Sequence, residues 1–143
     1  AAMALYLRQL PSAEPPREVA AAAPGTEGSG SGAKLYEKHC AQCHGEQGQG
    51  VRGTGGGFAY LPLAGNRMVT MNSPANLVQI VLNGGFAPAT AAHPRPFGMP
   101  PFVLTLSDGE VAAILTHVRT EWGNQAAPVS ELEVQQLRGA AVR

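Results

Sequence analysis

Cys40-Ala41-Gln42-Cys43-His44 forms a C-x-x-C-H run, which is the attachment signature of c-type haem. Two cysteines three positions apart lie on one side of a helical turn, so both thiols can add to the vinyl groups of one haem. The histidine that follows them places an imidazole nitrogen on the iron. The run therefore predicts a domain around one haem c, covalently bound through Cys40 and Cys43, with His44 as an axial ligand.

Other interpretations of the two cysteines have less support. The chain holds only these two among 143 residues, which leaves none for a structural disulfide elsewhere or for a four-cysteine zinc site. A thioredoxin-like C-x-x-C needs a surrounding βαβ pattern, which the neighbouring sequence lacks. Residues 48–53 fit G-x-G-x-x-G by letter, but a dinucleotide site needs a strand before that motif. The haem motif stands there instead, so this glycine-rich segment is predicted to be a loop.

Composition narrows the class of protein further. Ten basic and ten acidic side chains give a formal net charge of zero, so no basic surface for nucleic acid or a membrane is indicated. No run of about 18 apolar residues predicts a transmembrane helix. Because haem c is attached outside the bacterial cytoplasm, the motif predicts a periplasmic location. The chain starts without an initiator methionine, so it is expected to be a processed or excised piece.

Turn residues and periodicity divide the chain into parts. Residues 1–10 are predicted to be the end of a helix, and residues 1–8 resemble residues 112–119. This similarity indicates a remnant of a preceding, similar domain, with a coincidental arm as the alternative. Residues 11–30 have the composition of a Pro/Ala/Gly/Ser linker. Residues 31–124 are predicted to form a mono-haem domain, and residues 125–143 a C-terminal arm with a short helix.

The regular elements are expected to be helical. Helices are predicted at residues 32–40 and 73–83 from their apolar periodicity and end signals. Two capping boxes, Ser107 to Glu110 and Ser130 to Glu133, predict the starts of two more. Strand-like alternation is scarce. The predicted fold is all-α, with short helices around the haem.

The second axial ligand of an electron carrier must stay bound in both oxidation states, and a thioether does so. The candidates are the four methionines, Met3, Met68, Met71 and Met99. Met99 is favoured because it lies in Phe97–Phe102, where prolines stiffen the backbone and Gly98 permits close approach to the haem. Met68 and Met71 are expected to fill gaps in the core, and Met3 lies outside the predicted domain. His93, on the same loop as Met99, is the alternative ligand.

Residues 31–124 resemble a mono-haem class I cytochrome c domain. The shared stretches are CAQCHG (40–45), LPLAGN (61–66), GMPPF (98–102) and LSDGEV (106–111). More narrowly, LPLAGN, NGGFAPAT (83–90) and EWGNQAAPVS (121–130) resemble the third haem domain of triple-haem subunits. Such subunits serve membrane-bound bacterial alcohol, gluconate or aldehyde dehydrogenases.

The resemblance implies a class I fold and a role for several side chains. The carbonyl of Leu61 or of Pro62 is expected to accept the Nδ1–H bond of the axial histidine, and the choice between the two stays open. His117 stands where an aromatic residue is usual, which implies a packing role. By residue type alone, Tyr60, Arg67 and Arg95 are candidate haem-propionate contacts, and the alternative for each is a solvated loop residue.

The function implied is one-electron transfer, with no catalytic residue in this chain. The donor would be a dehydrogenase catalytic subunit or an upstream haem domain, and the acceptor a quinone, another cytochrome or an oxidase. The parent complex would sit at the outer face of the bacterial inner membrane. One alternative is a free-standing soluble periplasmic cytochrome c. Another is a haem protein with an open sixth site for ligand binding or peroxidatic chemistry.

Overall fold

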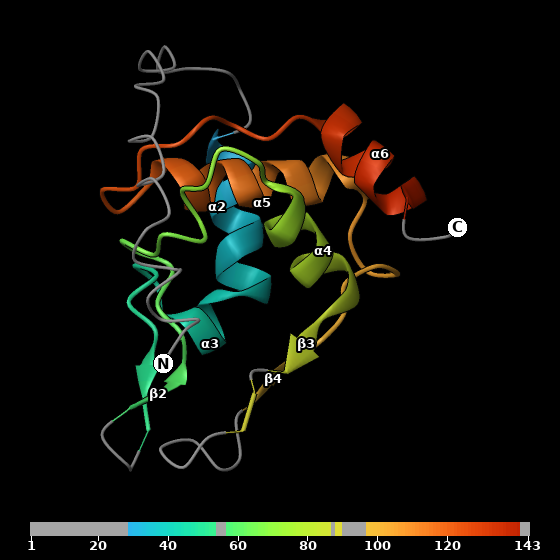
Figure 1. Cartoon of the computed structure of the whole chain (residues 1–143). Helices are drawn as coiled ribbons and strands as arrows, with labels where there is room; N and C mark the ends of the chain where they lie inside the picture. Colours follow the sequence, from blue (N-terminus) through green and yellow to red (C-terminus); the bar gives the residue numbers. More distant parts are fainter. Residues whose placement is uncertain (1–28, 54–56, 87, 90–96, 141–143) are drawn as a thin grey trace, which may run out of the picture.

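The computed structural model describes residues 29–53, 57–86, 88–89 and 97–140 (Figure 1). The predictions for residues 1–10 and for residues 11–28 of the linker lie outside this part of the chain. The helices are α2 (Ser29–His39), α3 (Ala41–His44), α4 (Ala75–Asn83), α5 (Asp108–Thr120) and α6 (Glu131–Ala140). The strands are β1 (Val51–Arg52), β2 (Phe58–Tyr60), β3 (Gly85–Phe86) and β4 (Gly98–Met99). No helix within these ranges is long and apolar enough to cross a membrane.

Both predicted capping boxes are present. At the start of α5, the backbone N–H of Glu110 donates to Ser107 Oγ (3.3 Å), and the Ser107 N–H donates to the Glu110 carboxylate (2.8 Å). The same reciprocal pair, Ser130 with Glu133, starts α6. These local signals placed two helix starts correctly. Helix α2, in contrast, begins at Ser29, inside the stretch predicted to be a linker.

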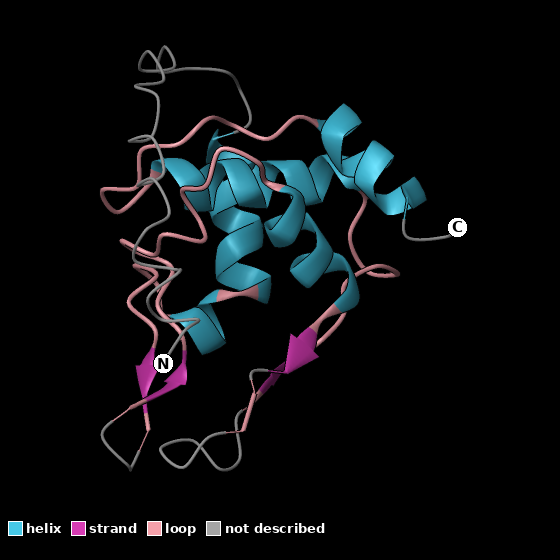
Figure 2. Cartoon of the chain, in the orientation of Figure 1, coloured by secondary structure: helices cyan, strands magenta, loops and turns pink. Residues whose placement is uncertain are grey.

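The prediction of an all-α fold was incomplete, because the described residues also form two antiparallel strand pairs. Strand β1 pairs with β2, and β3 pairs with β4 in the register Gly85 to Met99 and Phe86 to Gly98. Figure 2 shows both pairs extending from the same side of the helices. Strands of two or three residues are too short to show alternating hydrophobicity, so sequence periodicity could not find them.

Helices α2 and α5 cross at close range. A Cβ atom on Gly32 would overlap the carbonyl of Ala113, so only glycine permits this approach. Beside the crossing, the ring of Tyr36 lies 5.5 Å from that of His117 and 4.9 Å from that of Trp122, measured between centroids. The Tyr36 hydroxyl donates to the carbonyl of Gly45 (2.7 Å). The crossing therefore fixes the end of α2 and the residues that follow it.

Helix α6 packs on α4 and α5 as part of the same core. Val134 is fully buried, and Val129, just before α6, is nearly so. Thr116 Oγ1 on α5 accepts the backbone N–H of Val129 (3.0 Å), and Gln79 Nε2 on α4 donates to the carbonyl of Leu137 (3.0 Å). The C-terminal arm is thus held by the domain up to α6.

Arg119 is 1 % exposed and joins three segments of the chain. Its Nε donates to the carbonyl of Ala127 (2.7 Å), and one terminal nitrogen donates to the carbonyls of Val69 (2.8 Å) and Met71 (2.9 Å). Buried carbonyls need such donors, because desolvation without a hydrogen bond is costly. Arg119 therefore fastens both the segment before α4 and the segment before α6 to α5.

We expect Arg119→Met to lower the free energy of unfolding of the haem-loaded protein by about 3 kcal/mol, since buried carbonyls would lose their donor. Arg119→Lys should recover part of that loss through the one or two bonds that an ammonium can still make. Urea denaturation followed by circular dichroism measures both. A loss below about 1 kcal/mol in Arg119→Met would contradict this role.

His117 gives the fold a pH dependence. Its Nδ1 is buried and has no hydrogen-bond partner among the described residues. Burial lowers the pKa of His117 below its ordinary value of 6.5, while Glu121 acts in the opposite direction with smaller effect. Below about pH 6.5 the unfolded chain therefore binds a proton that the folded chain excludes, and stability falls.

We expect His117→Phe to keep the ring packing and to reduce the loss of stability between pH 7.5 and pH 5.5, which lie about one unit above and below the ordinary histidine pKa of 6.5. Melting temperatures of both proteins across this range provide the measurement. An unchanged slope in the variant would assign the acid sensitivity to other groups.

Candidate haem site

The C-x-x-C-H segment occupies the joint between α2 and α3. Cys40 lies between the two helices, and its N–H still donates to the Tyr36 carbonyl of α2 (2.8 Å). The N–H of His44 donates to the carbonyl of Cys40 (2.9 Å), which closes one turn. Both thiols are free and partly buried. The segment therefore offers Cys40 and Cys43 from a single turn, with the imidazole directly after them.

The environment of Cys40 differs from that of a redox-active cysteine. Burial, and then the neighbouring Cys43, raise the pKa of Cys40 to about 11. Reactive C-x-x-C cysteines have a lowered pKa, because the thiolate is the nucleophile. The pKa of Cys40 is therefore shifted in the direction opposite to that of a redox-active C-x-x-C cysteine.

The ring of His44 is oriented by a backbone carbonyl. Its Nδ1 lies 2.9 Å from the oxygen of Leu61. Of the two carbonyls considered from the sequence, Leu61 is the one at hydrogen-bond distance, and that of Pro62 accepts from Asn66 Nδ2 (2.9 Å). With the proton on Nδ1, Nε2 is the nitrogen with a lone pair for a metal.

The segment that carries Leu61 is held from two sides. The carbonyl of Gly48 accepts the N–H groups of Leu63 (2.7 Å) and Ala64 (2.9 Å). On the other side, the buried amide of Asn124 accepts from the Gly65 N–H (2.9 Å) and donates to the carbonyl of Leu63 (3.1 Å). The sequence predicted residue 124 only as the end of the mono-haem domain. The proximity of Asn124 to residues 63–65 depends on tertiary contacts that sequence spacing does not reveal.

Met99 lies on β4 and is partly buried against the hydrophobic core. Gly84, with φ +66°, lies directly against it, because a Cβ at that position would overlap the Met99 carbonyl. After Met99 the chain is bound to the end of α4. The N–H of Phe102 donates to Val81 (3.0 Å), and the N–H of Val103 donates to Leu82 (3.0 Å).

The remaining predicted site residues are placed as follows. The ring of Tyr60 packs on Phe97, with centroids 5.0 Å apart. Arg67 is exposed, and its carbonyl accepts from Thr70 Oγ1 (3.3 Å). Arg95 and the alternative ligand His93 lie outside the described residues.

The prediction that Met68 and Met71 fill the core was wrong, because their side chains are 48 % and 40 % exposed. Val69, between them, is the side chain that turns inward. The carbonyls of Val69 and Met71 point to Arg119, and this contact sets the orientation of the segment.

Apolar side chains are exposed around the two strand pairs. Leu61 follows β2 and is 58 % exposed, and Phe97 precedes β4 and is also mostly exposed. Val51 on β1 and Phe86 on β3 are exposed as well. A cofactor with large apolar faces suits such surroundings. With paired thiols, an oriented imidazole and a thioether, the residues present fit a haem.

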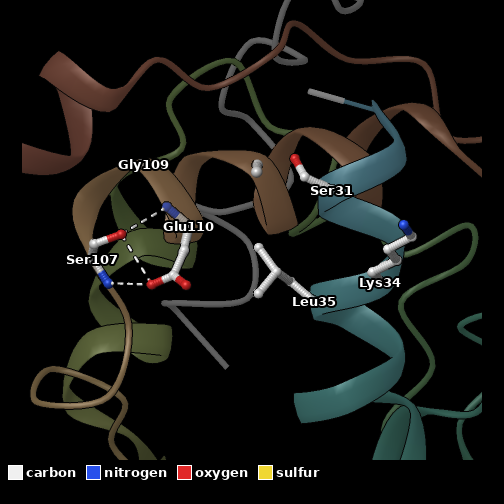
Figure 3. A pocket seen from close by; sticks show the side chains of 7 residues that line it. Ser31, Lys34, Leu35, Ser107, Gly109 and Glu110 are labelled. Carbon is white, nitrogen blue, oxygen red and sulfur yellow. Dashed lines mark hydrogen bonds between the residues drawn. The ribbon is translucent and has the colours of Figure 1, made fainter. Parts of the chain in front are cut away.

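A groove between α2 and the start of α5 lies apart from these groups (Figure 3). Its volume is about 540 Å³. It is lined by Ser31, Lys34, Leu35, Ser107, Gly109, Glu110 and Ala113. The carboxylate of Glu110 is engaged in the capping box. None of the described residues that line the groove is a cysteine, histidine or methionine, and the groove is therefore distinct from the cluster of Cys40, Cys43 and His44.

Dehydrogenase cytochrome subunits are among the proteins similar to this chain. The cytochrome c subunit of the quinone-dependent alcohol dehydrogenase of Gluconacetobacter polyoxogenes is 35 % identical over 96 % of this chain and 30 % of its own length. The gluconate 2-dehydrogenase cytochrome c subunit of Pantoea cypripedii is 34 % identical over 77 % of this chain and 24 % of its own length. The chain thus spans less than a third of these subunits.

A smaller cytochrome is also similar. Cytochrome c-552 of Thermus thermophilus is 31 % identical over 75 % of this chain and 83 % of its own length. Residues 29–118 match the protein family described as cytochrome c oxidase, cbb3-type, subunit III. This range contains the C-x-x-C-H segment, the strand pairs and most of α5. The chain therefore belongs to the cytochrome c family that includes subunit III of cbb3-type oxidases, and it is an electron-transfer protein of the haem c type.

Proposed function

We propose that this chain is a class I cytochrome c domain that carries one electron on one haem c, with His44 and Met99 as the axial ligands. The observation that carries the proposal is the contact between His44 Nδ1 and the Leu61 carbonyl (2.9 Å). It holds the ring in one orientation and leaves Nε2 for iron. The bound haem supplies an iron that alternates between Fe(III) and Fe(II).

The position of Met99 supports its role as the second ligand. It is the described methionine whose backbone is fixed by a strand pair and whose side chain packs against the core. The two other described methionines are exposed on a segment that Arg119 orients by its backbone. A neutral, soft thioether favours Fe(II) and remains bound to Fe(III), which suits an electron carrier.

We infer the partners from the relatives. Cytochrome subunits of alcohol, gluconate and fructose dehydrogenases match this chain over a part of their length. The chain would then be the terminal haem domain of such a subunit, at the periplasmic face of the membrane. It would receive electrons from the dehydrogenase catalytic subunit or an upstream haem and pass them to a quinone or an oxidase. The domain would begin with α2 at Ser29 and would include α6, which packs on α4 and α5.

A free-standing periplasmic cytochrome is the second candidate. It is favoured by the match to cytochrome c-552, of which this chain covers 83 %. In that case a diffusing redox partner, not a fixed neighbour, would supply the electron.

Met99→Ala tests the ligand assignment. We expect the near-infrared charge-transfer band of the Met–Fe(III) bond to disappear. The reduction potential should fall by on the order of 100 mV, since axial ligands span about 0.8 V. Met68→Ala and Met71→Ala are matched controls that should keep both properties. If the band is lost in one of the controls but kept in Met99→Ala, the methionine replaced in that control is the axial ligand. Rapid CO binding by the unmodified ferrous protein would indicate an open sixth site.

Reconstitution tests the partner. We expect ethanol or gluconate to leave the oxidised haem of the purified chain unchanged, because this chain contributes no catalytic groups in our proposal. Adding the catalytic subunit of the matching dehydrogenase, freed of its own cytochrome, should give substrate-dependent haem reduction in stopped-flow absorbance. Reduction by substrate alone would contradict the assignment as a carrier. No reduction with any of these subunits would favour the free-standing cytochrome.

A further inference from the structure

We propose, on the basis of the proposed ligation by Met99, that Arg138 on α6 is a positioning residue for that ligand. Arg138 lies 39 positions after Met99 in the sequence, near the end of the chain. Its guanidinium nevertheless reaches the loop that connects Met99 to α5. The terminal helix would thereby control how firmly the sulfur is held at the haem.

All three nitrogens of the Arg138 guanidinium are used. Nε forms an ion pair with Asp108 Oδ1 (2.5 Å), in the first turn of α5. One terminal nitrogen donates to the carbonyl of Val103 (2.7 Å), and the other to the carbonyl of Leu106 (3.0 Å). A planar guanidinium can donate hydrogen bonds to several acceptors at once, because its N–H groups have a fixed arrangement. A lysine ammonium cannot reproduce this arrangement.

The loop needs such a fastening because its tip has little packing. Leu104 is 97 % exposed, and its neighbours Val103 and Thr105 are also exposed. On the side of α4, the N–H groups of Phe102 and Val103 donate to the last turn of that helix. Arg138 binds two carbonyls of the same loop, those of Val103 and Leu106. Val103 is therefore held by α4 through its N–H and by α6 through its carbonyl.

Movement of this loop would reach Met99 directly. Only Pro100 and Pro101 separate Met99 from Phe102, and proline fixes its φ angle. The short stiff connection transmits a displacement of Phe102 or Val103 to β4. Gly84 also lies directly against the Met99 carbonyl, so β4 is in close contact with the end of α4. Without Arg138, the loop would keep only its N–H bonds to α4 and the pairing of β4 with β3, and Met99 would be held less firmly.

Helix α6 has other attachments, so the contribution of Arg138 can be separated from docking of the arm. Val134 is buried, and Thr116 bonds to both polar backbone atoms of Val129, at 3.0 Å to its N–H and 3.2 Å to its carbonyl. Thr116→Val removes both hydrogen bonds to Val129, and the side chain keeps nearly the same volume. It leaves the loop of Val103 and Leu106 untouched and is the matched control.

The test uses the full haem-loaded chain in the ferric state. Imidazole displaces a thioether from ferric haem only when the loop releases it, so the rate of imidazole binding reports release of Met99. We expect Arg138→Ala to raise this rate about tenfold or more, because charge-assisted bonds to the loop are lost. Arg138→Lys should give an intermediate rate, and Thr116→Val the rate of the unmodified protein.

The outcomes separate this inference from the proposed function. If the unmodified protein lacks the Met–Fe(III) near-infrared band, the ligation by Met99 fails and the inference fails with it. If the band is present but Arg138→Ala binds imidazole at the original rate, only the positioning role is overturned. An equal increase in the rate of imidazole binding by Thr116→Val would also overturn the positioning role. Weaker docking of the whole C-terminal arm would then explain the faster binding. Should Arg138→Ala not retain haem, the comparison of Arg138→Lys with the unmodified protein decides.

Discussion

The crossing of α2 over α5 at Gly32 is the contact on which the candidate haem site depends. Because Gly32 lies against the Ala113 carbonyl, the two helices approach too closely for any side chain at that point. Tyr36, one turn further on, is buried by the same approach and bonds to the carbonyl of Gly45. The C-x-x-C-H segment ends at His44, between these two residues. Its position is thus set by a backbone contact remote from the ligands themselves.

Polar side chains hold the loops on which the two proposed axial ligands rely. Asn124 binds the segment after Leu61. Arg119 binds the segment before α4, and Arg138 binds the loop after Met99. All three come from the C-terminal part of the chain, and each bonds to backbone carbonyls. A small domain has little apolar surface to bury in its loops, so bonds from long polar side chains substitute for packing.

Short-range signals were sufficient for part of this structure. The spacing of Cys40, Cys43 and His44 predicted a haem protein, and the family match agrees with it. The boxes at Ser107 and Ser130 predicted two helix starts, because capping involves residues only three positions apart.

Features without a local sequence signal make up the rest. The short strand pairs form between segments with no periodicity of their own. The start of α2 at Ser29 runs through a Gly/Ser stretch whose intrinsic helix propensity is low. The exposure of Met68 and Met71 follows from the carbonyl bonds of Arg119, 48 positions from Met71. Such effects depend on which segments meet in space, and a single sequence does not contain that information directly.

The most direct measurement of the axial ligand is NMR of the ferrous haem-loaded protein with methyl-labelled methionine. The ring current of haem shifts the methyl group of a bound thioether far from the ordinary methionine region. We predict one such signal among the four methionines, connected to the backbone of Met99. Four signals at ordinary positions, or a shifted signal that belongs to Met68 or Met71, would contradict ligation by Met99.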